Sequence, residues 1–562
     1  MKKSLLSLAV AMAFAATGVN AAPVTKHVVL ISVDGLHQND LDWFVQQNPT
    51  STLATLVKNG VEFNNAQTPF PSDSFPGMVA QATGGNPTST GVYYDDTYNR
   101  NLLPPGTTDC VGTAPGTEVT WFEAIDKNLN QLDAGQNIKG LYDNIPASYA
   151  LISKLDSNPI NLIDPTMLPV DPATCQPMYP HQYMRVNTMF EVAKSHGMRT
   201  AWSDKHPAYE ILNGPSGNGV TEFFTPEINS MISNPADSSG PDFTKDNINT
   251  QIYDNLKVNA VLNWAQGRTH NGSVAVVPAI YGMNFQTVST AQKLNTSHYY
   301  DPANPSNVLV GLGGYVTDAT TGKQVPGFVL SAALSFVDQS IGKMVKTADN
   351  NTVFVISAKH GQSSENRKDL IIINDGNMTG ALDDAWNAAN PGANGLVAFA
   401  MDDDGILIWL KDRSPAAVEF ARNFLWNYSG TGIGSDAQGN KVTGKAFTNA
   451  GLKAIYAGAD AAAFIKVPVS DERVPDIIGI AKTGTVYAGG KLSKIAEHGG
   501  DAVNDRHVPI IVSGASVAKG VTVTSPVQTK QIAPTILSLL GLPTSQLQAV
   551  QIEKTQVLPQ LK

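Results

Sequence analysis

A serine at the start of a predicted helix is the first candidate for chemistry. The stretch PFPSDSFPGMVAQATG, residues 69–84, predicts a loop that tightens into a helix. Pro76 fits the first turn of that helix, where its missing N–H costs nothing, and Ser74 lies just before the start. Unpaired N–H groups and the helix dipole at this end favour an anion and the alkoxide form of serine. Ser74 is therefore either a nucleophile or a helix cap, the commoner role of serine at such a place.

Polar residues also follow four predicted strands. Apolar runs at 26–33, 198–202, 275–284 and 352–357 are typical of strands in the parallel sheet of an α/β protein. Ligands bind at the carboxyl edge of such sheets, so we expect the polar residues at these strand ends to converge on one site. They are Asp34, Asp204, Lys205, His206, Asn284, Lys359 and His360.

These residue types favour metal-assisted chemistry. Serine, histidine and aspartate alone would suggest a hydrolase triad, but the turn G-x-S-x-G is absent, and the chain reads SDSFP around Ser74. A strand-end carboxylate, Asp34, together with histidines in His-Gly turns, His360 and His498, favours a divalent metal that binds the serine oxygen. The three aspartates at 402–404 lack the spacing of a calcium loop, and we interpret them as a solvated turn.

The N-terminus predicts export. A Lys-Lys start, an apolar stretch at 5–16 and small residues at 19–21 are typical of a bacterial secretory signal peptide that is cut after Ala21. No cysteine follows the cut, and we find no later run of about 18 apolar residues. We expect a soluble periplasmic or secreted protein without a membrane anchor. In that oxidising compartment, Cys110 and Cys175 should form one disulfide.

The length and net charge of the chain limit its possible folds and binding partners. The chain has 562 residues and a net charge of −10 with no basic tract, which argues against a nucleic-acid scaffold but allows a small phosphate ester. We predict a three-layer α/β/α fold with a mostly parallel central sheet. The signal peptide covers 1–21 and the core covers 22–361 and 491–562. A small α+β insertion with its own sheet, at 362–490, should cap the site.

Five motifs carry a family resemblance. VDG at 33–35, TPFPSDSFPG at 68–77, SAKHG at 357–361, EHGG at 497–500 and QIAPTILSLLGLP at 531–543 lie in the order seen in the alkaline phosphatase superfamily. The chain most resembles the type I phosphodiesterase/nucleotide pyrophosphatase family, over most of the mature chain. The resemblance implies a phosphoric-ester hydrolase in which two zinc ions bridge the substrate phosphate.

The resemblance also implies which residues bind the two zinc ions, and this sequence differs from the family at several of these positions. One zinc would be held by Asp34, Ser74 and His360, but Lys359 stands where the family has a ligand carboxylate. The other zinc would be held by His498, but the expected Asp-x3-His pair is missing, since the chain there reads NFQTVSTAQK. An asparagine that binds a phosphate oxygen in the family falls near Asp95.

These differences leave three interpretations. In the first, the site holds one metal ion, bound by Asp34, Ser74 and His360. In the second, Lys359 and Lys205 supply positive charge where a metal would lie. In the third, the site binds a ligand but does not cleave it.

We predict a serine-nucleophile phosphodiesterase that acts on a small phosphate ester with a divalent metal, zinc, as one ion rather than two. Lys205 and Lys359 would stabilise the equatorial oxygens, and Asn284 would line the site. The segment TAWSDKH also resembles sulfatases, in which Lys and His contact the anion, which implies a catalytic role for His206. A sulfatase-like or other ester hydrolase is thus one alternative, although the C/S-x-P-S-R motif is missing, and a degenerate binding protein is the other.

Overall fold

The centre of the molecule is one mixed sheet. The computed structural model describes residues 25–143, 148–302, 304–492 and 494–562, so the predicted signal peptide, 1–21, lies outside the described residues. The sheet has nine strands, in the order β24–β2–β23–β14–β1–β9–β7–β8, with β25 beside β2. The strands are β1 (His27–Val33), β2 (Gly60–Gln67), β7 (Thr200–Ser203), β8 (Glu222–Phe224), β9 (Ile280–Phe285), β14 (Thr352–Ser357), β23 (His507–Gly514), β24 (Val521–Val523) and β25 (Val527–Gln528).

Strand direction confirms the predicted sheet. Strand β1 pairs in parallel with β14 and β9, and β9 pairs in parallel with β7. Strand β23 is antiparallel to both of its neighbours, β14 and β2. The sheet is therefore mostly parallel, and the carboxyl ends of β1, β7, β9 and β14 meet at one edge.

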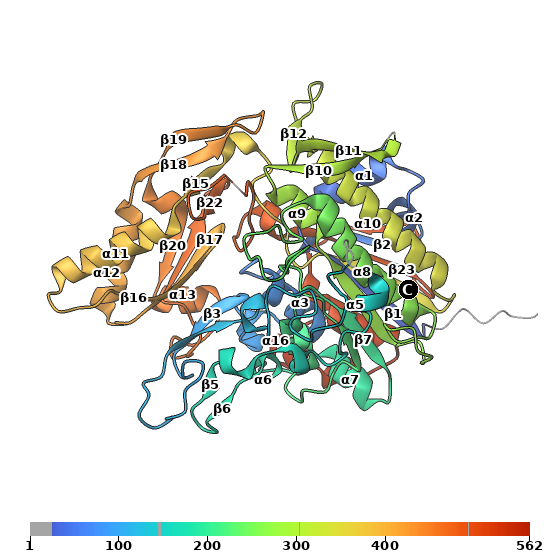
Figure 1. The fold of residues 1–562 in the computed structure, drawn as a ribbon, viewed down its shortest axis with the longest axis horizontal. Coiled ribbons are helices and arrows are strands. Elements are labelled where there is room, and N and C mark those ends of the chain that lie inside the picture. Colours follow the sequence, from blue (N-terminus) through green and yellow to red (C-terminus); the bar gives the residue numbers. More distant parts are fainter. Residues whose placement is uncertain (1–24, 144–147, 303, 493) are drawn as a thin grey trace, which may run out of the picture.

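Helices cover both faces of the sheet (Figure 1). Alternate residues of β1 enter different cores, since Val28 and Leu30 pack in one and Val29 and Ile31 in the other. This alternation follows from the period of two in a strand and explains why the run is apolar throughout. One layer holds α1 (Gln38–Gln47), α2 (Thr52–Lys58), α8 (Asn247–Ala265), α9 (Thr287–Lys293) and α10 (Phe328–Thr347), and the other holds α3 (Ser74–Thr83), α7 (Met189–Ser195) and α15 (Ile532–Leu539).

Helix α10 is the one helix in the described part of the chain that has the length and apolar composition to cross a membrane. More than half of its apolar window, 56%, is buried inside the protein. Its Val329, Leu330 and Ile341 belong to the core beneath α8, so packing accounts for its apolar face.

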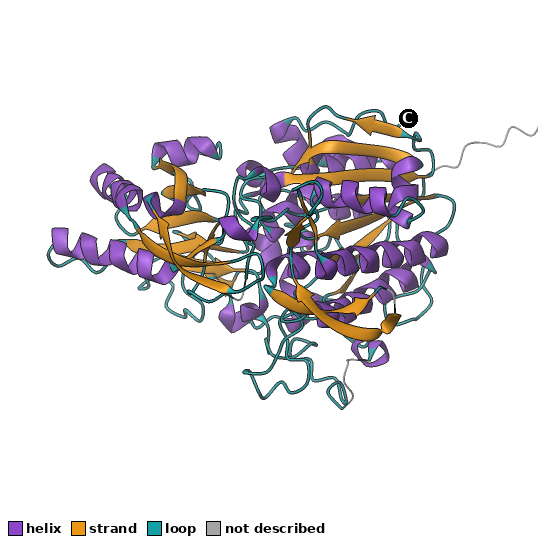
Figure 2. Cartoon of the chain, turned by 90° about the horizontal axis from the view of Figure 1, so that it is seen from above, coloured by secondary structure: helices purple, strands orange, loops and turns teal. Residues whose placement is uncertain are grey.

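A second lobe is formed by the segment predicted as an insertion (Figures 1 and 2). It has its own apolar core, which includes Ile406, Ile408 and Leu425. Two four-stranded sheets replace the single expected sheet, and their orders are β19–β18–β15–β22 and β16–β17–β21–β20. Its elements are β15 (Ile371–Ile373), α11 (Asp375–Ala389), β16 (Val397–Asp402), β17 (Gly405–Leu410), α12 (Pro415–Asn427), β18 (Gly430–Ser435), β19 (Lys441–Phe447), β20 (Leu452–Ala457), α13 (Ala459–Phe464), β21 (Ile477–Ala481) and β22 (Thr485–Tyr487).

Short elements fill the remaining loops. The predicted disulfide is confirmed, because Cys110 and Cys175 are bonded across a separation of 65 residues in the loop-rich region. The bond agrees with an oxidising compartment. The short helices are α4 (Pro87–Thr90), α5 (Tyr149–Ile152), α6 (Pro180–Tyr183), α14 (Val503–Arg506) and α16 (Gln548–Glu553), and the hairpins are β3 (Asp96–Asn99) with β4 (Thr117–Thr120), β5 (Val170–Asp171) with β6 (Gln176–Pro177), β10 (Thr296–Asp301) with β11 (Asn304–Leu312), and β12 (Tyr315–Thr317) with β13 (Gln324–Pro326).

Candidate active site

Helix α3 begins at Ser74 and is capped by Asp73. The Asp73 carboxylate accepts a hydrogen bond of 3.0 Å from the backbone N–H of Phe75. The sequence placed Ser74 just before the helix, whereas the structure places it in the first turn and gives the cap to Asp73. Because aspartate satisfies the free N–H at this end, the hydroxyl of Ser74 is not needed as a cap.

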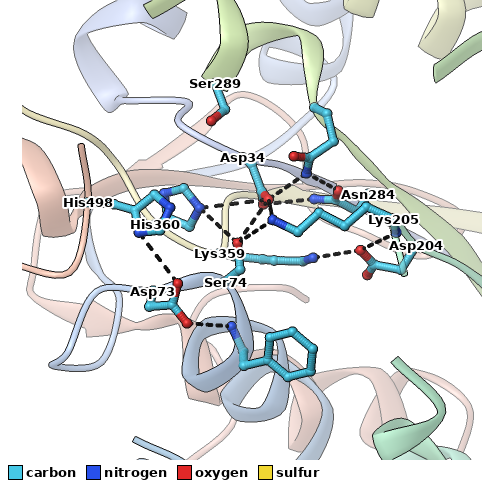
Figure 3. A network of polar contacts seen from close by, with 12 residues as sticks. Asp34, Asp73, Ser74, Asp204, Lys205, Asn284, Ser289, Lys359, His360 and His498 are labelled. Carbon is cyan, nitrogen blue, oxygen red and sulfur yellow. Dashed lines mark hydrogen bonds and ion pairs between the residues drawn. The ribbon is translucent and has the colours of Figure 1, made fainter. Parts of the chain in front are cut away.

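Three side chains from strand ends surround the Ser74 hydroxyl (Figure 3). Its Oγ lies 3.3 Å from Asp34 Oδ2 and 3.2 Å from His360 Nε2. The ammonium of Lys205 donates to the same Oγ at 3.0 Å. These residues follow β1, β14 and β7, so the shared edge of the sheet brings them together as predicted.

Asp34 is held in its ionised form. Its carboxylate accepts hydrogen bonds from Asn284 Nδ2 at 2.7 Å and from Gln286 Nε2 at 2.6 Å. Burial alone would raise the pKa of Asp34, but the charge of Lys359 and the neighbouring His360 hold that pKa well below its ordinary value. Asn284 therefore lies in the site as predicted, but it orients Asp34. Gln286, two positions after Asn284, lines the site beside it by hydrogen bonding to the same carboxylate.

Lys359 is buried and bonded away from the serine. Its Nζ donates to Asp204 Oδ1 at 2.8 Å and to Tyr209 Oη at 2.8 Å. Burial lowers the pKa of Lys359, and the charge of Asp204 opposes that shift. For Lys205 the balance is reversed, because several nearby carboxylates, of which Asp34 has the largest effect, together outweigh burial and raise its pKa. Lys205 is thus the ammonium that contacts the Ser74 hydroxyl.

His498 lies on the other side of His360. The two rings are 4.0 Å apart at their centroids, and His498 Nδ1 lies 3.4 Å from Asp73 Oδ1. Burial, together with the nearby His360, lowers the pKa of His498 well below its ordinary value. The imidazole is therefore neutral at pH 7, the form that accepts a proton or binds a metal.

The motifs, the sheet and this constellation agree with the comparison to known proteins. Residues 28–502 match the family described as type I phosphodiesterase / nucleotide pyrophosphatase. The chain belongs to this family. It is a hydrolase of this family, and the family implies a phosphate-ester substrate.

Solved structures support the family fold. Murine ectonucleotide pyrophosphatase/phosphodiesterase 5 aligns with a TM-score of 0.51 at 12% identity, over 92% of this chain and 96% of that one. Wild-type alkaline phosphatase PafA aligns with a TM-score of 0.54 at 13% identity, over 93% of this chain and 97% of that one. A search of curated proteins found no match. At these identities the structures establish the fold alone.

This family typically uses divalent metals, and three atoms around Ser74 could hold one such ion. Asp34 Oδ2, Ser74 Oγ and His360 Nε2 lie 3.2–3.7 Å from one another. Tetrahedral zinc with bonds of about 2.0–2.2 Å has ligand separations of about 3.3–3.6 Å, so these three atoms fit one ion. A second ion of the family's kind does not fit, because amides are poor ligands for transition metals and Gln286 offers only an amide after β9.

A second group of candidate metal ligands lies beside His498. Ligand atoms of Asp403, Glu497 and His498 all lie within 4.8 Å of one another. The charge of Glu497 is already paired, because Lys293 Nζ lies 2.7 Å from it and Lys494 also contacts it. This group is therefore a weaker candidate for a cation than the three atoms around Ser74.

The prediction of a solvated turn at 402–404 was wrong. None of the three aspartates is exposed, and Asp404 is buried. Tyr94 Oη donates to Asp403 at 2.8 Å, and Ser363 Oγ donates to Asp404 at 3.0 Å. Burial raises the pKa of Asp403 to about 7. Three consecutive acids are usually solvated, and only the docking of the second lobe against the core buries these.

The two remaining predicted residues have different surroundings. Asp95 Oδ1 is buried and has no hydrogen-bond partner among the described residues. Burial, and then the charge of Asp73, raises the pKa of Asp95 well above its ordinary value, which favours the protonated carboxyl, the form that can donate. His206 is not brought to Ser74, because its Nδ1 lies 2.8 Å from Glu227.

Proposed function

We propose that this protein hydrolyses phosphoric diesters through a covalent phosphoserine at Ser74. The observation that supports this most directly is the contact of 3.0 Å between the Lys205 ammonium and Ser74 Oγ. A cation at that distance favours the alkoxide and compensates charge on the equatorial phosphoryl oxygens. The hydroxyl proton has two acceptors within reach, Asp34 Oδ2 and His360 Nε2.

The proposed reaction has two displacements at phosphorus. Ser74 Oγ attacks in line, the bond to the ester oxygen breaks, and the leaving alkoxide takes up a proton. Water then attacks the phosphoserine, which releases the phosphate product and regenerates the hydroxyl. In the first displacement the leaving alkoxide takes the proton that Asp34 or His360 received from Ser74. In the second, His498, neutral at pH 7, would accept the proton of the attacking water, and a protonated Asp95 would donate to a phosphate oxygen.

A single divalent cation, zinc by its donor set, completes the proposal. Asp34, Ser74 and His360 would hold it, and when bound it lowers the pKa of the serine hydroxyl and neutralises a phosphoryl oxygen. Lys205 contacts the same serine oxygen. Either the ion or the ammonium can therefore supply the charge, which keeps the second interpretation open.

Nucleotide esters are the proposed substrate class. An inactive variant of murine ectonucleotide pyrophosphatase/phosphodiesterase 5 was solved in complex with AMP. That protein shares the fold at 11% identity with a TM-score of 0.51, so the substrate of this chain stays a proposal. We also propose that the protein acts in the periplasm or outside the cell, after removal of residues 1–21.

A substrate panel and a serine variant test this function. Turnover of bis-p-nitrophenyl phosphate should exceed that of p-nitrophenyl phosphate and p-nitrophenyl sulfate, with Zn²⁺, Mn²⁺, Ca²⁺ or Mg²⁺ added. Ser74→Ala should lower diester turnover on the order of 10³-fold or more. Ser72→Ala is the matched control, since Ser72 is also buried but its hydroxyl donates to the backbone of Asp505.

Mass spectrometry of quenched reactions should find phosphate on the peptide that contains Ser74. Retained turnover in Ser74→Ala would rule out this nucleophile. Faster turnover of the sulfate would favour the sulfatase-like alternative, and no turnover of any ester would favour a binding protein.

A further inference from the structure

A second group of ligand-type side chains lies around His206, away from the serine. Ligand atoms of Glu123, His206 and Glu227 all lie within 4.8 Å of one another. Glu123 opens a short 3₁₀ turn, η1 (Glu123–Ile125), His206 precedes another, η4 (Pro207–Asn213), and Glu227 follows β8. Three segments far apart in the chain thus bring two carboxylates and an imidazole together.

A fourth carboxyl group, that of Asp126, lies beside the group without a cation. Asp126 is only 6% exposed, and no N–H or hydroxyl group of the described residues donates to either of its carboxylate oxygens. The carboxyl groups of Asp126 and Glu227 lie against each other. In the described part of the chain, no lysine or arginine pairs with Glu123, Asp126 or Glu227, and the single ion-pair contact is that of His206.

No ammonium or guanidinium group of the described residues contacts these carboxyl groups. Burying carboxylates that have neither a contacting cation nor a full set of hydrogen bonds is strongly unfavourable. A buried imidazole beside three carboxylates is also the donor set that binds transition metals in proteins. We propose that Glu123, Asp126, His206 and Glu227 hold one divalent transition-metal ion, zinc or manganese, at a site separate from Ser74.

A second buried histidine–glutamate pair, His181 with Glu210, serves as a comparison for the contact between His206 and Glu227. His181 Nδ1 lies 2.8 Å from Glu210 Oε1, almost the same contact as that of His206 with Glu227. Glu210 is fully buried, as Glu227 is. Among the described residues, however, no further ligand-type side chain completes a group around His181 and Glu210. His181 and Glu210 therefore form only a hydrogen-bonded pair inside the fold. The group at Glu227 contains two further carboxyl groups, those of Glu123 and Asp126.

The ion would act as a structural clamp. It would join η1, the start of η4 and the loop after β8, so its binding energy would stabilise the folded chain. His206 directly follows Lys205, and the two side chains diverge toward the ion and toward Ser74 Oγ. The clamp would therefore fix the backbone that carries the ammonium.

Metal counting on the full chain tests the site without any activity assay. Asp34→Asn is the starting variant, because it weakens the proposed ion at Ser74. After equilibration with Zn²⁺ or Mn²⁺ and removal of free metal, elemental analysis should find one ion per Asp34→Asn chain. Adding Glu227→Gln should raise the Kd at least about 100-fold, since second-layer contacts alone account for about 10- to 100-fold. Adding Glu210→Gln should leave the Kd unchanged.

A chain that binds no ion at micromolar Zn²⁺ or Mn²⁺, or that keeps its ion in Glu227→Gln, would overturn the proposal. In that case protons shared between the carboxyl groups of Asp126 and Glu227 would replace the ion. Asp126→Asn serves as a second variant if Glu227→Gln does not fold. In crystals of the wild-type protein, anomalous scattering should show a metal between His206 and Glu227. A peak at Ser74 alone would also overturn the proposal. A lack of esterase activity would not affect either measurement.

Discussion

Two lysines reach the site from strand ends, and their partners give them different roles. Lys205 donates to Ser74 Oγ, whereas Lys359 donates to Asp204 and Tyr209. Lys359 also lies 4.0 Å from the centroid of the Tyr209 ring, which stabilises an ammonium further. These contacts support the proposal that Lys205 supplies the catalytic charge, and we propose a mainly positioning role for Lys359.

Lys205→Met should lower kcat/KM for a phosphodiester about 10²- to 10³-fold, the effect of losing one donor that stabilises transition-state charge. Steady-state kinetics on bis-p-nitrophenyl phosphate would measure it. Lys205→Arg should recover part of the loss. Lys194→Met is the control, since Lys194 bonds to Asn218 on the surface. Full activity in Lys205→Met would contradict the role of the ammonium.

Lys359→Met should destabilise the protein by about 3–5 kcal/mol, because it leaves the buried carboxylate of Asp204 without its cation. Urea unfolding followed by circular dichroism would measure the change in free energy. Adding Asp204→Asn should recover much of the stability, since the unpaired charge is then removed. A single variant as stable as the wild type would show that the pair contributes little.

At the scale of elements, the loop between β1 and α1 is tied to the segment after β14. His37 caps α1, and its Nδ1 lies 2.7 Å from Tyr315 Oη. Its Nε2 lies 2.9 Å from the carbonyl oxygen of Gln362. These contacts hold the turn that carries Asp34 against the turn that carries His360, so a residue outside the site maintains its geometry.

His37 should make stability depend on pH. Burial alone would lower the pKa of His37, but Asp40 raises it to about 9, above the 6.5 of an unfolded chain. The charged form is thus favoured by folding. Its contribution, about 3 kcal/mol, is fully present below pH 6.5 and is lost as the pH rises through 9.

Urea midpoints measured between pH 6 and pH 10 should show this fall in the wild type. His37→Asn should be less stable at pH 6 and should change less across the same range. A wild-type profile that is flat from pH 6.5 to 9 would be inconsistent with a raised pKa.

At the scale of the whole molecule, the site lies where the second lobe meets the core. The backbone N–H of Asp404, in the turn between β16 and β17, donates to the carbonyl of His498 at 3.2 Å. Tyr94 joins both sides, because its hydroxyl contacts Asp403 and the carbonyl of His498. This contact supports the proposal that residues 362–490 form a cap beside the site.

Removal of divalent metal should lower diester turnover at least about 10-fold, because the donors Asp34, Ser74 and His360 would lose the charge that activates the hydroxyl. Dialysis against dipicolinate followed by titration with Zn²⁺ would measure the loss and its recovery. The Asp126→Asn variant, in which the proposed ion at Glu227 is weakened, should recover diester turnover at the same Zn²⁺ concentration as the wild type. Full turnover without metal would instead assign the charge to Lys205.

The family, the sheet and the edge on which the site lies were determined by the sequence. Apolar runs that end in polar residues predict parallel strands, and parallel strands bring their carboxyl ends together without further information. Ser74, Asp34 and His360 meet for this reason. Cys110 and Cys175, as the only two cysteines in the sequence, left one possible disulfide.

Only the tertiary structure decided which partner each side chain takes. Neighbours such as Lys205 and His206 point in different directions, and their partners, Ser74 and Glu227, lie far away in the chain. The aspartates at 402–404 look solvated until the second lobe docks and buries Asp404. Contacts of this kind depend on packing between distant segments, and packing leaves no local pattern in the sequence.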